Sequence, residues 1–254
     1  MIKSELWSCS RFQSGKLHFL DYTFSSPANN LACDEALLDL CEETGDELLR
    51  LWEPQGYFIV LGSSGSVQDE IHVETCEADG IPILRRHSGG GTVLQGPGCL
   101  NYSLMLQINS EGPTRNITET TNYIMQRHAE SLSRLIGEKV EMKGSSDLTM
   151  GGKKFSGNAQ RRKLKALLFH GTFLLDFDLS QIEKYLKMPP KQPLYRERRL
   201  HRDFVRNVRF ASSILKEELR NVWHANQNVV VIPRERIEYL VETKYSNEKW
   251  NLKL

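Results

Sequence analysis

Two glycine-rich stretches concentrate the residue types that bind anions. Residues 85–103 begin with Arg85 and Arg86 and continue into three successive glycines, and residues 150–160 carry a lysine pair directly after a second run of glycine. Glycine lets the backbone bend so that its N–H groups close on ligand oxygens, and arginine forks suit phosphate or carboxylate groups. We therefore predict that the two stretches face each other across one ligand pocket.

Neither stretch matches the common phosphate-binding loops. A P-loop ends in Gly-Lys-Ser/Thr, and the dinucleotide fingerprint spreads its glycines between a strand and a helix. Here the glycines at 89–91 run into Thr92, Val93 and Leu94, which favour a strand. A structural turn between two strands explains either stretch taken alone, so the pocket hypothesis depends on both together.

Composition narrows the class of protein. The 254 residues have a net charge of +1 and five cysteines without a CxxC pair, which argues against a polyanion partner, a disulfide framework and a zinc site. We predict one domain over residues 1–254. The cysteine pattern fits a reducing cytoplasm, and no apolar run is long enough to cross a bilayer, so we expect a cytoplasmic protein that binds no membrane. We expect no nucleic-acid partner, because the sequence has neither a recognisable reading motif nor a basic overall charge.

Hydrophobic periodicity predicts the elements that must position the two stretches. The predicted strands cover residues 16–24, 48–52, 57–61, 81–84, 100–108, 167–177 and 229–232, with short pieces around 140 and 154. The predicted helices cover residues 30–45, 67–78, 117–137, 180–186, 213–223 and 234–243. This mixed order predicts an α+β domain with a mixed, largely antiparallel central sheet flanked by helices.

Several local features carry their own predictions. The turn at residues 53–56 predicts a hairpin between the strands on either side, and Ser180 is expected to open its helix as part of a capping box. Asp34 and Glu35 are assigned to a solvated helix face. His128 lies on an apolar stripe and is assigned to the core.

Residues 195–209 contain the one local concentration of positive charge. Six arginines lie there, interleaved with aromatic side chains. They fit a solvated face paired with Glu197 and Asp203, and they fit equally a dock for an acidic protein or for phosphate. The sequence leaves both interpretations open.

Taken in order, the motifs of this chain resemble the lipoate-protein ligase family, with the related octanoyl and lipoyl transferases and biotin ligases. The Lys-Phe-Ser-Gly-Asn-Ala element at 154–159 is the most specific of them. The motifs occur in the family's order and span about the first two thirds of the chain, at residues 30–37, 52–54, 85–93, 152–159 and 169–172.

The resemblance implies a defined chemistry. Lipoate or octanoate would react with ATP, in the presence of Mg²⁺, to form an acyl adenylate, and the acyl group would pass to a lysine of an acceptor protein. Such acceptors are the E2 subunit of a 2-oxoacid dehydrogenase, the H protein of glycine cleavage, or an H-like lipoate-binding protein. Anionic reactants require fixed cations and backbone N–H groups.

The resemblance also implies roles for matching residues. Lys154 matches the family's central lysine and is the expected catalytic residue. Its neighbour Lys153 is the competitor, and strand alternation lets only one of the two side chains point inward. Asp147 is the expected Mg²⁺ ligand, and His170 would shape the acyl pocket or position the incoming lysine. The expected ATP-binding residues are Arg86, Gly91, Thr92, Val93, Leu94 and Lys154. The expected lipoate-binding residues are Ser88, Gly89, Gly90, Lys154 and His170. An apolar groove for the acyl chain would use Leu84, Val93 and Leu94, for which a plain core role fits equally.

Three departures from the family pattern stand out. Gln95 replaces a histidine, so an acid or base role at that position is in doubt. Ser146 replaces the asparagine that usually precedes the aspartate. The resemblance ends near residues 244–250, so we expect the small C-terminal accessory domain to be absent and either a separate accessory subunit or a variant that does without one.

Two alternatives remain open at this stage. An acyltransferase would move octanoyl or lipoyl groups between carrier proteins without ATP and would need a cysteine near Lys154; Cys99 is the candidate, although a buried structural thiol is its expected role. A binding module without turnover is the other alternative, and the retention of Lys154 with Arg86 and Asp147 argues against it.

Overall fold

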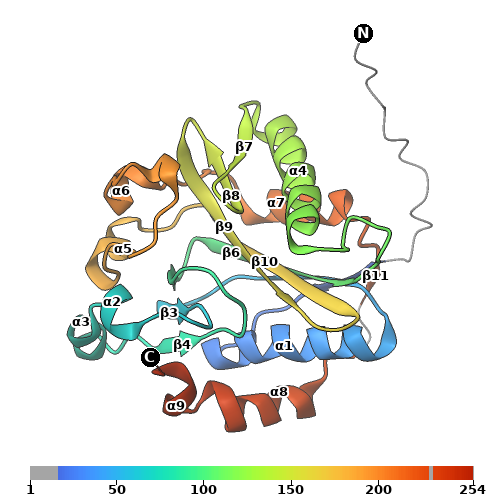
Figure 1. Ribbon diagram of the computed structural model, residues 1–254, viewed down its shortest axis with the longest axis horizontal. Helices are drawn as coiled ribbons and strands as arrows, with labels where there is room; N and C mark the ends of the chain where they lie inside the picture. Colours follow the sequence, from blue (N-terminus) through green and yellow to red (C-terminus); the bar gives the residue numbers. More distant parts are fainter. Residues whose placement is uncertain (1–16, 229–230, 254) are drawn as a thin grey trace.

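The computed structural model describes residues 17–228 and 231–253, which form two β-sheets with helices packed around them (Figure 1). The larger sheet has eight strands in the order β11-β1-β2-β6-β10-β9-β8-β7. Its strands are β1 His18–Asp21, β2 Leu48–Trp52, β6 Cys99–Gln107, β7 Val140–Lys143, β8 Asp147–Met150, β9 Lys153–Arg162, β10 Ala166–Leu174 and β11 Gln227–Asn228. The smaller sheet, in the order β4-β3-β5, contains β3 Phe58–Leu61, β4 Ile83–Arg85 and β5 Val93–Gln95.

Most neighbouring strands of the larger sheet are antiparallel. β1 is parallel to β2 and β11, whereas every step from β2 to β7 is antiparallel. The predicted α+β class with a mixed, largely antiparallel sheet is therefore confirmed. The strands from β7 to β10 follow one another as a meander, which places the second glycine stretch at the β8–β9 turn and along β9, as predicted.

Helices cover both faces of the larger sheet. α1 Pro27–Thr44 packs against β6 and β10, with α8 Arg234–Leu240 outside it (Figure 1). α4 Ile117–Ile136 and α7 Ser212–Val222 pack on the opposite face. Leu104 and Leu106 of β6 share a core with them, whereas Met105 between these two residues belongs to the core under α1. The remaining elements are α2 Val67–Glu70, α3 Val73–Ala78, α5 Ser180–Tyr185, a 3₁₀ turn Leu194–Arg196, α6 His201–Phe204, a π-helical turn Val241–Tyr245 and α9 Glu248–Asn251.

The predicted hairpin between residues 48–52 and 57–61 is wrong. All residues of β2 and β3 are buried, and a buried strand needs hydrogen-bonded neighbours on both edges. β2 obtains them from β1 and β6, whereas β3 obtains them from β4 and β5 in the other sheet. Residues 53–56 therefore connect the two sheets.

Helix boundaries follow the sequence signals only in part. The helix expected at 117–137 is confirmed, since Asn116 accepts a hydrogen bond from the Glu119 amide at 2.9 Å and Gly137 ends it with a φ of 75°. The expected capping box is wrong, because Ser180 is the first helical residue and its hydroxyl bonds to Asp178. The helix expected at 67–78 is divided into α2 and α3.

The ends of the chain are covered only in part by the described residues. Residues 229–230 of the strand expected at 229–232 lie outside them, as does Cys9. Near the other end, Trp250 packs onto the body of the protein, where its indole N–H donates to the Arg85 carbonyl at 2.9 Å. No helix in residues 17–228 and 231–253 is long and apolar enough to cross a membrane.

His128 is a core residue, as predicted. It is buried between α4 and α7, where the Trp223 indole N–H donates to its Nε2 at 2.8 Å. Burial lowers the pKa of His128 to about 3, so the folded protein holds this imidazole neutral.

We predict that His128 makes the fold sensitive to acid. Between pH 6.5 and pH 3 the unfolded chain protonates this side chain and the folded chain does not, so the free energy of unfolding falls as the pH falls. In urea unfolding across this window, wild type should lose about 1 kcal/mol per pH unit more than His128→Gln. Parallel pH profiles for the two proteins would contradict this assignment.

Candidate functional site

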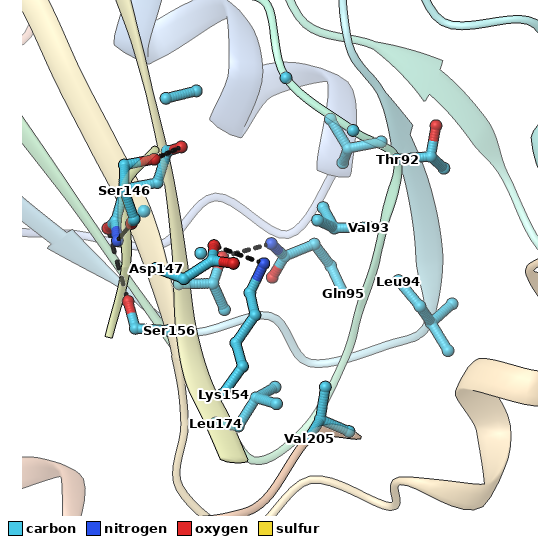
Figure 2. Close-up of a pocket in the computed structure, with 18 of the residues that line it drawn as sticks. Thr92, Val93, Leu94, Gln95, Ser146, Asp147, Lys154, Ser156, Leu174 and Val205 are labelled. Carbon is cyan, nitrogen blue, oxygen red and sulfur yellow. Dashed lines mark hydrogen bonds and ion pairs between the residues drawn. The ribbon is translucent and has the colours of Figure 1, made fainter. Parts of the chain in front are cut away.

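A cavity of about 540 Å³ lies between the two glycine-rich stretches. One side is the segment that leads into β5, the other is β9 with the loop before β8, and residues 187–205 close a third side. Figure 2 shows Thr92 to Gln95 on one side of this space and Ser146 with Asp147 on the other. The prediction that both stretches meet at one pocket is confirmed.

Most of the predicted site residues line this cavity. Ser88 and Gly89 do not; Ser88 lies behind the lining, and its hydroxyl is 2.6 Å from Nε2 of His170. Leu84 belongs to the core instead of the cavity wall. The predicted residues that do line it are Arg86, Gly90, Gly91, Thr92, Val93, Leu94, Asp147, Lys154 and His170.

Lys154 points into the cavity, where it contacts Asp147, and Tyr195 in turn contacts Asp147. Its ammonium lies 2.7 Å from Oδ1 of Asp147 (Figure 2), and the Tyr195 hydroxyl donates to Oδ2 of the same carboxylate at 2.6 Å. Burial and the neighbouring Asp147 charge raise the pKa of Tyr195, so its hydroxyl stays protonated as a donor. Lys153 is exposed, which confirms the predicted alternation.

The residues after Lys154 fix its geometry. A Cβ on Gly157 would lie 2.7 Å from the Lys154 ammonium, so only glycine leaves that space to the lysine. The Asn158 amide donates to the Ser146 carbonyl at 2.6 Å and accepts from the Tyr102 hydroxyl at 2.6 Å. These bonds tie the loop that carries Asp147 to the centre of the sheet.

The two arginines of the first stretch have different surroundings. Arg86 turns back on its own loop, where Nη2 donates to the Gly89 carbonyl at 2.6 Å and to the Gly91 carbonyl at 2.9 Å. Burial lowers the pKa of Arg86 to about 10, which still leaves it charged at neutral pH. Arg85 lies on the opposite side of the strand and does not line the cavity; its Nη1 donates to the Gly65 carbonyl at 2.7 Å. Arg85 is therefore a structural residue.

Asp34 is a site residue that sequence reasoning misassigned. It is 3% exposed, not solvated, and lines the cavity. Its Oδ1 is 2.6 Å from Nη1 of Arg50, and its Oδ2 accepts from the Ser103 hydroxyl at 2.8 Å. Burial alone would raise the pKa of Asp34, but Arg50, His170 and Ser103 together hold it below its usual value.

A signal for this pair was present in the sequence. Arg50 interrupts an otherwise apolar buried strand, and a buried cation requires an anionic partner. Asp34 lies three residues from both Leu31 and Leu37, so helical spacing places it on the core-facing stripe. Glu35 beside it is also engaged, since its carboxylate is 2.7 Å from the Lys244 ammonium. α8 and the π-helical turn contact α1, and Glu35 is therefore only partly exposed.

Gln95 forms part of a closed ring of hydrogen bonds at the cavity. Its amide donates to the Thr172 hydroxyl at 2.7 Å, Thr172 donates to Oδ1 of Asn101, and the Asn101 side-chain amide donates back to Oε1 of Gln95 at 3.0 Å. These three side chains satisfy one another without a titratable group. Gln95 therefore offers no acid or base near neutral pH.

The four cysteines in the described part of the chain are buried and do not line the cavity. Cys99 is 1% exposed, and burial raises its pKa to about 12. Cys33, Cys41 and Cys76 are also buried, and none of these four residues lines the cavity.

The carboxylates around the cavity do not form a metal cage. Among the described residues, no group of three or more His, Cys, Asp or Glu side chains is placed to hold a metal ion. Asp147 supplies a carboxylate that faces the cavity beside Lys154. This donor set fits Mg²⁺ that arrives on a substrate's phosphates, since that ion needs few protein ligands.

Residues 26–225 match the family model for the lipoyl protein ligase A/B catalytic domain. The chain belongs to this family. The predicted resemblance is thereby confirmed, and the matched region contains every cavity residue discussed above. The chain therefore belongs to an enzyme family that includes both ligases and acyl transferases.

The relatives include both kinds of enzyme. A protein from Aeropyrum pernix, named as a candidate lipoate-protein ligase A, is 34% identical to this chain. The match covers 65% of this chain and 60% of that protein. The octanoyltransferase LipM of Geobacillus kaustophilus is 27% identical over 92% of this chain and 97% of its own.

Solved structures share the fold. A lipoate-protein ligase A bound with ATP superposes with a TM-score of 0.81 at 22% identity, covering 93% of this chain and 98% of that one. A bi-partite lipoate-protein ligase of Thermoplasma acidophilum, described with its E2 lipoyl domain, gives 0.79 at 21% identity, with coverages of 93% and 96%.

We predict that Gly157→Ala impairs catalysis without unfolding the protein. The added methyl group would displace the flexible end of Lys154 from Asp147, because the two groups cannot share the space. Acyl transfer to an acceptor should fall by about 100-fold, with the melting temperature nearly unchanged. Gly56→Ala is the matched control, since its Cβ meets nothing within 4 Å. Equal activities for the two variants would contradict this role of Gly157.

Proposed function

We propose that this protein is an ATP-dependent lipoate-protein ligase. The observation that carries the proposal is the Lys154 ammonium beside the Asp147 carboxylate, facing the glycine loop across a cavity that no described thiol lines. A fixed cation of this kind suits a reaction between two anions, the carboxylate of lipoate and the α-phosphate of ATP.

The proposed reaction has two steps. An oxygen of the lipoate carboxylate attacks the α-phosphorus of ATP, and pyrophosphate leaves to give lipoyl-AMP. The ε-amine of an acceptor lysine then attacks the acyl carbon and AMP leaves, giving the amide. Lys154 would stabilise the charge that develops on the phosphate in the first step and on the carbonyl oxygen in the second.

The remaining residues have matching proposed roles. Backbone groups of Gly91, Thr92, Val93 and Leu94 would hold the nucleotide, and Arg86 would do so after exchanging loop carbonyls for phosphate. Gly90 and His170 would contact lipoate, while Ser88 and Gly89 would support them from behind. Asp147 would contribute one oxygen to the Mg²⁺ carried by ATP. That ion would neutralise phosphate charge when bound.

Partners follow from the same chemistry. The acceptor would be a lipoyl domain, as in the system of the Thermoplasma protein, and a separate small accessory subunit would complete the enzyme if it resembles that bi-partite ligase. Modification of such acceptors with ATP fits a cytoplasmic enzyme of one domain.

The competing function is an ATP-independent acyltransferase, which the similarity to octanoyltransferase LipM supports. A reaction through a cysteine thioester needs an accessible thiolate. The burial of Cys99, with its raised pKa, speaks against that route.

We expect the purified protein to lipoylate an acceptor domain when given lipoate and ATP, and Cys99→Ala to retain this activity within about twofold. Mass spectrometry of the acceptor measures the product. Two results together would support the transferase instead of the ligase. The protein would give no product with lipoate and ATP, and it would transfer octanoyl groups from a carrier protein without ATP, an activity that Cys99→Ala abolishes.

Substitution of the two neighbouring lysines tests the assigned strand register. Lys154→Ala should fold normally and lose acyl-adenylate formation by about 100-fold or more, because it removes the fixed cation. Lys153→Ala is the control and should stay active, since that side chain is exposed. Single-turnover assays with lipoate and ATP measure both, and the reverse pattern would refute the role of Lys154.

A further inference from the structure

Positive charge on this chain is gathered beside the cavity. Residues 187–209 hold eight lysines and arginines and two acidic residues, a net charge of +6, so the rest of a chain with a total of +1 carries −5. The segment closes one side of the cavity, and it runs from the end of α5 past α6 (Figure 1). The charge is therefore placed at the site.

This charge is not neutralised within the described protein. None of the ion pairs among the described residues involves residues 187–209, so the predicted pairing with Glu197 and Asp203 is wrong. Arg196 and Arg199 instead pack against the Phe204 ring, with their guanidinium carbons 4.7 and 5.3 Å from its centre, and donate to backbone carbonyls. The positive charge of the segment is therefore not held in ion pairs among the described residues.

The segment also presents exposed apolar side chains. Leu194 is 98% exposed, and the next residue is Tyr195, whose hydroxyl holds Asp147. Leu200 on the same segment is exposed too. Arg198 and Arg202 lie on either side of it in sequence and are exposed. An exposed leucine with charged neighbours has the composition of a protein-binding surface, an apolar centre with a polar rim.

We propose that Leu194, Arg198 and Arg202 form the docking surface for an acceptor domain whose modified lysine is flanked by carboxylates. This inference rests on the proposed function. A lysine that approaches a segment of net charge +6 is repelled unless its own neighbours are acidic. Acidic flanks would pair with Arg198 and Arg202 while the lysine enters the cavity.

The charge distribution favours a compact acidic domain over nucleic acid. An extended polyanion would leave the basic segment and meet the rest of the chain, which carries a net −5. A domain with a local acidic patch avoids that repulsion. The cations that line the cavity itself, among them Lys191 and Arg196, face a different part of the site from the exposed Arg198 and Arg202.

The test separates docking from adenylate formation. We would measure kcat and KM for an acidic lipoyl domain, and lipoate-dependent pyrophosphate–ATP exchange without acceptor, in Arg198→Glu/Arg202→Glu and in Leu194→Asp. The acceptor KM should rise about tenfold or more in each, with exchange and kcat within about twofold of wild type. Added salt should raise the KM of wild type more than that of the arginine variant.

A matched control reverses the same amount of charge elsewhere. Arg134→Glu/Lys249→Glu changes exposed residues of α4 and α9 that do not line the cavity, and it should leave the acceptor KM within about twofold. An unchanged KM in the segment variants, or an equal rise in the control, would overturn the proposal. A third result would also overturn it: wild type binds a random oligonucleotide in a salt-sensitive way, and the arginine variant loses this binding but keeps the acceptor KM of wild type.

Failure of the ligase function gives a different result. If wild type shows no pyrophosphate exchange but accepts acyl groups from a carrier, the ligase proposal falls, and the same variants are then assayed with that carrier and acceptor. A KM effect there upholds the docking surface, and its absence overturns it.

Discussion

The buried ion pair between Asp34 and Arg50 is the constraint on which the site depends. It joins α1 to β2 at 2.6 Å with both side chains almost fully buried, and removing one partner of such a pair destabilises a protein by about 3–5 kcal/mol. Asp34 then accepts from Ser103 on β6 and lies 3.9 Å from His170 on β10, whose other nitrogen contacts Ser88. One carboxylate thus aligns a helix, three strands and the glycine loop.

The opposite wall of the cavity is set by the meander. β9 places the Lys154 ammonium where Gly157 leaves room, and Asp147 and Tyr195 hold it from the two segments that pack beside this strand. The two contacts place the ammonium beside Asp147 before a substrate arrives. A preorganised cation needs little rearrangement during reaction, which is the condition for strong electrostatic stabilisation.

The sequence predicted what depends on neighbours along the chain. Alternation predicted that Lys153 and Lys154 point to opposite faces, and capping residues placed the helix from Asn116 to Gly137. The glycine motifs identified both walls of the cavity. The sequence did not predict which strands and side chains pair in the tertiary structure. The turn at 53–56 looked like a hairpin, yet two fully buried strands each needed other neighbours. Asp34 was predicted to be solvated, but it is buried because it pairs with Arg50. Tyr195 bonds to Asp147 although the two residues are 48 positions apart in the sequence.

Adenylate formation by this protein is tested most directly by lipoate-dependent exchange of labelled pyrophosphate into ATP, with purified protein and no acceptor. We expect exchange that requires lipoate, because the cavity beside Lys154 would form and reverse the adenylate by itself. Absence of exchange under conditions in which the same preparation transfers an acyl group from a carrier protein would contradict it.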